Sequence, residues 1–134
     1  MVQVDNPEKF TTGHELIDAD HRELVEQMNC LHDAITEQWA LEDQRQIFNT
    51  LIERTAEHFR HEEALMQRIA YTGFAKHKAE HDMLLEEVRE LQVRFNSGSI
   101  ALSENLFDYL SEWLNFHTAT TDKKLAEAAN AAAE

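Results

Sequence analysis

Apolar residues recur at alternating spacings of three and four positions along four stretches of the chain, at residues 21–35, 47–69, 74–95 and 106–117. The clearest series lies in the third stretch and reads Phe74, His77, His81, Leu84, Val88, Leu91 and Phe95. This period is typical of amphipathic helices, because buried strands alternate with a period of two. The pattern therefore predicts an all-α protein with four long helices.

Residues that break helices are scarce, since the chain has one proline and three glycines. Short turns make neighbouring helices antiparallel, so we expect an up-down-up-down antiparallel four-helix bundle. We predict a single domain over residues 1–134. Within it, residues 1–16 form an N-terminal arm, residues 17–125 form the bundle, and residues 126–134 form an alanine-rich C-terminal extension that frays.

The formal net charge of −14 argues against direct binding to nucleic acid or to anionic lipid headgroups. Cys30 is the only cysteine, which excludes an intrachain disulfide and fits a reducing compartment. We read no signal peptide at the N-terminus, and no apolar run approaches the roughly 18 residues that span a bilayer. We therefore expect a cytoplasmic monomer that does not insert into membranes.

Several polar residues fall on the same helical stripes as the core leucines. They are His21, His58, Glu62, His77, His81 and His117. A buried imidazole or carboxylate is costly unless it is paired or binds a metal ion. A lone histidine of this kind is better explained by a hydrogen bond within the core. Because all four predicted helices carry at least one, the pattern indicates a shared metal site.

Spacing along the helices adds a second constraint. His77 and His81 are four residues apart, as are His58 and Glu62, so each pair projects from one helix face. Asp122 stands five residues after His117, which on a regular helix is about 140° away from its direction. Asp122 can join the site only if the helix is distorted, for instance by a π-turn. From spacing alone, a solvated acid near a helix end is an equally good interpretation.

The number of candidate ligands limits the kind of site. Seven nitrogen and oxygen ligands exceed the four of a tetrahedral zinc ion, and calcium and magnesium prefer oxygen alone. Two ions bridged by carboxylates would use all seven. Imidazole suits iron, copper, nickel or zinc, so this chemistry leaves the metal open.

The motifs taken together resemble the hemerythrin family in its bacterial single-domain form. They are Ile17-Asp18-Ala19-Asp20-His21, His58-Phe59-Arg60-His61-Glu62-Glu63, His77-x-x-x-His81 and Trp113-x-x-x-His117-x-x-x-x-Asp122. The resemblance covers residues 13–125. Myohemerythrin, a member of that family, is a known four-helix bundle, so the fold is implied by the resemblance as well.

The resemblance implies reversible dioxygen binding at a non-haem di-iron centre (Fe2+/Fe3+) with an oxo or hydroxo bridge. By that resemblance one iron has three histidine ligands, His77, His81 and His117. The other iron has two, His21 and His58. The carboxylates of Glu62 and Asp122 bridge the two irons. With the bridge included, one iron then has six ligands and the other five. Dioxygen would bind at the vacant position.

A dry apolar wall must surround such a centre, because water and stray protons would release the bound oxygen as peroxide and leave both irons oxidised and inactive. The candidates for that wall, each of which ordinary core packing also explains, are Leu24, Phe59, Trp113 and Leu114. Thr118 stands where many relatives have isoleucine, and its hydroxyl could admit water or bond to oxygen, so we expect faster autoxidation. Phe10 replaces a tryptophan common in the N-terminal arm of relatives.

Three functions remain open at this point. The first is an oxygen carrier or store that can supply an oxygen-consuming enzyme, and that is not itself an enzyme. The second is an oxygen or redox sensor that acts through a partner protein. The third is a di-iron oxidase, peroxidase or nitric oxide scavenger, although the Glu-x-x-His pair of ferritin-like sites is missing. His14, His32 and His61 are expected to be ordinary surface or boundary residues.

Overall fold

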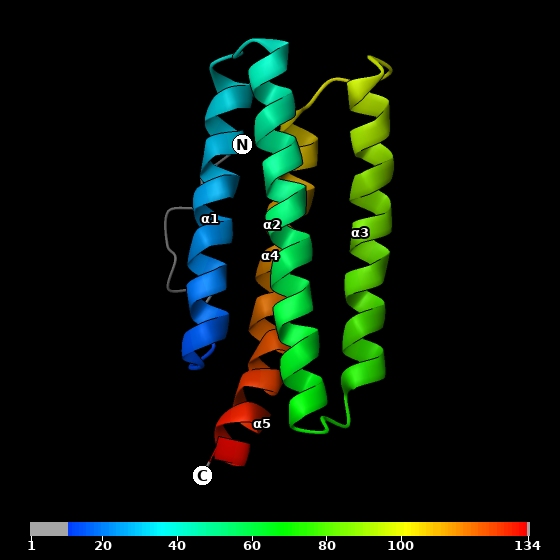
Figure 1. The fold of residues 1–134 in the computed structure, drawn as a ribbon. Helices are drawn as coiled ribbons and strands as arrows, with labels where there is room; N and C mark the ends of the chain where they lie inside the picture. The colour runs from blue at the N-terminus through cyan, green and yellow to red at the C-terminus, as the bar shows by residue number, and fades with distance from the viewer. Residues whose placement is uncertain (1–10, 134) are drawn as a thin grey trace.

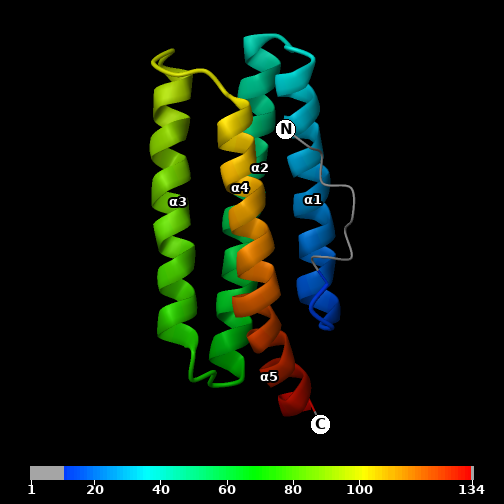
Figure 2. The ribbon, with the colours of Figure 1, turned by 180° about the vertical axis from the view of Figure 1, so that it is seen from behind.

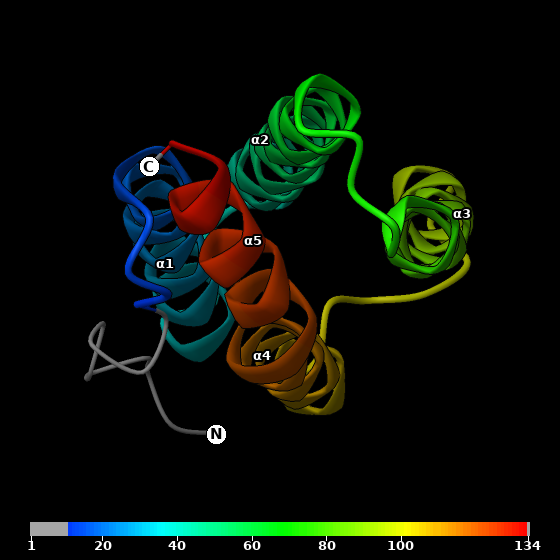
Figure 3. The same ribbon diagram turned by 90° about the horizontal axis from the view of Figure 1, so that it is seen from below.

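The computed structural model describes residues 11–133, which form an antiparallel bundle of helices with no strand among them (Figure 1). The elements in chain order are α1 (Glu15–Thr36), α2 (Leu41–Arg68), α3 (Phe74–Asn96), α4 (Glu104–His117), the π-helix η2 (Thr118–Asp122) and α5 (Lys123–Ala133). Viewed along the bundle axis, α1 to α4 occupy four corners (Figure 3). The predicted up-down-up-down fold is confirmed. Most of the expected arm, including Phe10, lies outside the described residues.

The start of α1 is tied down by the residues just before it. Asp18 accepts hydrogen bonds from the backbone N–H of Thr12 (2.7 Å) and of Gly13 (3.1 Å) and from the Thr12 hydroxyl (2.7 Å). Gly13 has a φ of +95°, a value that disfavours side chains with a Cβ. The ring of His14 caps the helix by accepting from the backbone N–H of Ile17. These contacts set where α1 begins, two residues earlier than expected.

The apolar core consists of two separate clusters along the bundle. The larger one runs from Leu24 to Leu114 and includes Phe48 and Phe107, both fully buried. The smaller one comprises Ile17, Leu65, Met66, Leu125, Ala126 and Ala129. In α1 the candidate ligand His21 lies between Leu24 of the larger cluster and Ile17 of the smaller one, and in α2 Glu62 lies between Phe59 and Leu65. The fold thus leaves one polar layer across the bundle.

The C-terminal segment differs from the expected fraying extension. Helix α5 continues through Ala133 and follows the direction of α4 with a bend (Figure 2). Ala126 and Ala129 are buried against the smaller apolar cluster, next to Ile17 and Leu65. Alanine is small enough for this helix to approach α1 and α2 closely, so the segment closes this end of the bundle. Among the described helices, none is both long and apolar enough to cross a membrane.

Candidate metal centre

The polar layer brings together all seven residues that were proposed as ligands. Each of them is at most 3% exposed. Their potential ligand atoms form two groups that share both carboxylates, and within each group the atoms lie within 4.8 Å of one another. The groups are Glu62, His77, His81, His117 and Asp122, and His21, His58, Glu62 and Asp122. Helices α1 to α4 and η2 all contribute.

The carboxylate of Glu62 faces both groups of histidines with different oxygens. Its Oε1 lies 3.0 Å from Nε2 of His77 and 3.1 Å from Nε2 of His81. Its Oε2 lies 2.7 Å from Nε2 of His58. One carboxylate therefore spans the space between the three-histidine group and the two-histidine group.

Asp122, from η2, repeats this arrangement. Its Oδ1 lies 3.0 Å from Nε2 of His77 and 2.9 Å from Nε2 of His117. Its Oδ2 lies 2.9 Å from Nε2 of His21. Two carboxylates that each divide their oxygens between the same two sets of imidazoles are arranged as bridging ligands.

Hydrogen bonding alone does not account for these contacts. An imidazole Nε2–H donates one hydrogen bond, yet Nε2 of His77 lies equally close to two carboxylate oxygens. Oδ1 of Asp122, Oε2 of Glu62 and Nε2 of His58 are buried and close to oppositely charged atoms, yet none of the three makes a hydrogen bond of good geometry. Ligand atoms about 2.1 Å from one ion and at right angles lie about 3.0 Å apart. The donor spacings in this layer match that value, so the residues fit a dinuclear metal centre.

The π-helix η2 is what carries Asp122 into the layer. Residues Thr118–Asp122 form this wider turn directly after His117. A π-helix is wound more widely, with i→i+5 hydrogen bonds, so residues five apart come onto nearly the same side. Nε2 of His117 and Oδ1 of Asp122 lie 2.9 Å apart. The distortion predicted from their spacing is present, and Asp122 is fully buried.

A set of outer carboxylates contacts the far nitrogens of the histidine rings. Oδ2 of Asp20 lies 3.0 Å from Nδ1 of His58, and Oε2 of Glu63 lies 3.0 Å from Nδ1 of His81. Such partners fix the ring tautomer, so that Nε2 is left with its lone pair toward the metal. Sequence reasoning missed Asp20 and Glu63. Asp20 directly precedes His21 and Glu63 directly follows Glu62, so their positions next to candidate ligands could have indicated this role.

Without metal, the buried groups stabilise one another electrostatically. Burial lowers the pKa of His58, but the charge of Glu62 and the hydrogen bond to Asp20 outweigh it and raise that pKa to about 10. In the same way the neighbouring carboxylates raise the pKa of His21 and of His77 to about 9, against the effect of burial. Burial raises the pKa of Glu62, yet the adjacent histidines hold it well below its usual range.

Aromatic rings cover two of the histidines. The Phe59 ring stacks on His81 with centroids 3.7 Å apart and planes 3° apart. The Trp113 ring stacks on His117 at 4.4 Å and 15°. These rings hold the imidazoles in place and exclude water from the three-histidine group.

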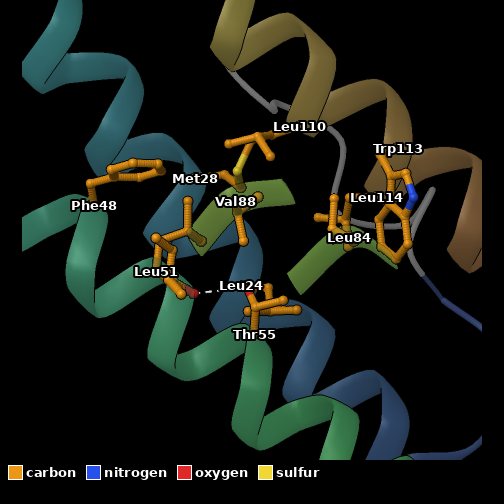
Figure 4. Close-up of a pocket in the computed structure, with 11 residues that line it drawn as sticks. Leu24, Met28, Phe48, Leu51, Thr55, Leu84, Val88, Leu110, Trp113 and Leu114 are labelled. Carbon is orange, nitrogen blue, oxygen red and sulfur yellow. Dashed lines mark hydrogen bonds between the residues drawn. The ribbon is translucent and has the colours of Figure 1, made fainter. Parts of the chain in front are cut away.

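An apolar cavity of about 40 Å³ lies in the larger core cluster (Figure 4). It is lined by Leu24, Trp113 and Leu114, which were predicted to form the apolar wall, but Phe59 is not among its lining residues. Thr55 and Leu84 also line it. Since these residues stand about one helical turn from the histidines of their own helices, the cavity adjoins the polar layer.

The remaining predicted residue, Thr118, is 1% exposed, and its hydroxyl oxygen has no hydrogen-bond partner. Of the histidines outside the layer, His14 caps α1 and His32 packs edge-on against Phe107. His61 is 56% exposed and its Nδ1 lies 2.9 Å from Oδ2 of Asp20. It is therefore linked to the layer through the same oxygen that contacts His58.

The fold and the donor set define a class, namely four-helix bundles that can hold a dinuclear metal centre between their helices. Comparison with known proteins gives the family. Residues 12–129 match the family described as the hemerythrin HHE cation binding domain. The chain belongs to the hemerythrin family, and the resemblance found in the sequence is confirmed.

Relatives of similar length support this assignment. A bacteriohemerythrin from Methylococcus capsulatus is 32% identical over 86% of this chain and 87% of its own length. A myohemerythrin from Sipunculus nudus is 30% identical over 87% of this chain and 86% of its own length. A crystal structure of wild-type hemerythrin superimposes with a TM-score of 0.89 at 27% identity, covering 96% of this chain and 98% of that chain.

Proposed function

We propose that this protein binds dioxygen reversibly at a non-haem di-iron centre in the polar layer. The observation that carries the proposal is the unequal division of donors, three histidines against two, around two shared carboxylates. The ligands in this proposal are His77, His81 and His117 for one iron, His21 and His58 for the other, and Glu62 and Asp122 for both. The two-histidine half has one protein donor fewer, which leaves room for a small ligand.

A bound iron pair would supply reversible two-electron chemistry with dioxygen. The residues of the chain provide the conditions for it. Asp20 and Glu63 orient the rings of His58 and His81 by accepting from Nδ1. The apolar cavity beside the layer offers dioxygen an uncharged space and keeps out the water that would promote irreversible oxidation.

The donor chemistry favours binding over catalysis. Five imidazoles are neutral ligands and only two carboxylates reach the centre. Ferritin-like di-iron sites use four glutamates, one from each of two helices and one from the Glu-x-x-His pair of each of the other two. We therefore propose a carrier or store rather than an enzyme, acting as a cytoplasmic monomer that can deliver oxygen to an oxygen-consuming enzyme. An oxo or hydroxo bridge and cycling between Fe2+ and Fe3+ belong to the same proposal.

Anaerobic loading with Fe2+ followed by rapid mixing with oxygen tests the proposal. We expect about two irons per chain and an oxygenated absorption spectrum that bleaches under argon and returns with oxygen. Asp122→Asn should lower the iron content, because an amide is a much weaker bridge than a carboxylate. Glu112→Gln, the same kind of change at an exposed position of α4, should leave it unchanged. Immediate conversion to a stable oxidised form would contradict reversible binding.

A further inference from the structure

A surface groove between α1 and α2 reaches one of the proposed ligands. The groove has a volume of about 340 Å³, and residues that line it include Leu16, Ile17, Asp20, His61, Glu62 and Arg68. The two helices lie side by side along this face (Figure 1). Glu62 is only 1% exposed, and its Oε2 is buried and makes no hydrogen bond of good geometry. That oxygen belongs to the two-histidine half of the centre, since it contacts His58.

A second, smaller opening of about 10 Å³ shares two lining residues with this groove. Its lining includes His58, Glu57, Asp20 and His61. Asp20 and His61 thus line both openings, one of which reaches Glu62 and the other His58. The two side chains meet at 2.9 Å, and the same Asp20 oxygen lies 3.0 Å from Nδ1 of His58 in the two-histidine half.

The chemistry of this pair suits a passing divalent cation. His61 is 56% exposed and Asp20 is 22% exposed, so both can be reached from solvent. Oε1 of Glu57 lies 3.8 Å from Nε2 of His61 and adds a second carboxylate at the rim. Imidazole and carboxylate together bind divalent transition metals. The net charge of −14 raises the concentration of such cations near the surface.

We propose that Asp20, His61 and Glu57 form a transient site for a hydrated divalent transition-metal ion, through which the two-histidine half is loaded. The ion exchanges some of its water for these donors and then passes to Oε2 of Glu62. The inference rests on the proposed dinuclear centre and not on oxygen binding. A transient site lowers the barrier for uptake and for release alike, so it changes both rates and leaves the affinity unchanged.

Cobalt uptake by the metal-free protein tests this route. Co2+ binding is followed by stopped-flow visible absorption, and its removal by excess EDTA is followed in the same way. His61→Gln keeps a donor for Asp20 but removes the metal-binding nitrogen. We expect it to slow uptake and release by the same factor, roughly ten-fold, within the range by which charged clefts accelerate association. The final two cobalt ions per chain and the final spectrum should not change.

Two further variants separate this route from other effects. Glu57→Gln should slow both rates less than His61→Gln does. His32→Gln is the matched control, because His32 also contacts one acid, Asp33 at 3.3 Å, but lies outside both openings. It should load and release at the rate of the unaltered protein.

The outcomes distinguish the route from the centre itself. Unaltered rates in His61→Gln would overturn the route. A 10- to 100-fold loss of affinity would overturn it as well, because that is the effect expected of an outer partner that positions a ligand. Fewer than two cobalt ions in the unaltered protein would overturn the dinuclear centre, whatever the rates.

Discussion

Replacing Thr118 by valine removes a hydroxyl group that the folded protein buries without a partner. Thr118 is 1% exposed, and its Oγ1 makes no hydrogen bond. Valine has nearly the same shape and the same branching at Cβ, so it fits the π-helix without a cavity or a clash. The change therefore isolates the cost of burying one unpaired hydroxyl.

The size of the effect follows from this burial. An unsatisfied buried hydroxyl costs about 1–3 kcal/mol, so we expect the free energy of unfolding to rise by about 1–2 kcal/mol. Unfolding entropy of about 2.1 cal/mol/K per residue gives about 0.3 kcal/mol/K for a chain of 134 residues. The melting temperature of the metal-free protein should then rise by about 4–7 °C.

Thermal unfolding followed by circular dichroism measures this shift. Thr120→Val is the matched control, because Thr120 lies in the same π-helix but is exposed and donates to the carbonyl of Phe116 at 2.7 Å. It should leave the melting temperature unchanged or lower it slightly. An unchanged or lower melting temperature for Thr118→Val would refute the reasoning, since it would mean that the hydroxyl has a partner in the folded protein.

Two more predictions concern the centre. Thr118→Ile should slow the decay of the oxygenated form to the oxidised form, because no hydroxyl then brings water to the centre; an unchanged decay rate in anaerobic–aerobic cycling would sink this idea. The metal-free protein should lose stability as pH rises. The folded-state pKa values of His21 and His77 are raised to about 9 and that of His58 to about 10, all above the ordinary 6.5. Their contribution is complete below about pH 6.5 and is lost as pH rises through 9–10. Urea titrations at pH 6.5 and 9.5 measure the loss, which iron loading should abolish because bound imidazole is already neutral; equal stability of the metal-free protein at both values would contradict the pairing.

The helices and most of the candidate ligands could be predicted because both depend on local periodicity. Six of the candidate ligands lie on the same helical stripes as the apolar residues. Because each residue of an α-helix is turned by about 100° from the one before, this shared period predicts that they face the interior. Even the demand for a distorted helix before Asp122 followed from its spacing to His117. The stripes predicted the rest of the core less well. Ile47 and Leu106 lie on the predicted stripes but are only partly buried, whereas Phe48 and Phe107, the residues that follow them, are completely buried. A helix inside a bundle buries a wider face than one line of residues.

The amino-acid sequence by itself determined which residue types face the interior of each helix, and hence that a polar layer rich in histidine had to form. Only the tertiary structure decided how that layer is connected. Oδ2 of Asp122 meets His21 across 101 positions of the chain, and Asp20 meets both His58 and His61 from another helix. Packing between helices also decides that the two oxygens of Glu62, and those of Asp122, contact different groups of histidines. These contacts depend on the axial register and rotation of helices that are far apart in sequence, and no local period contains that information.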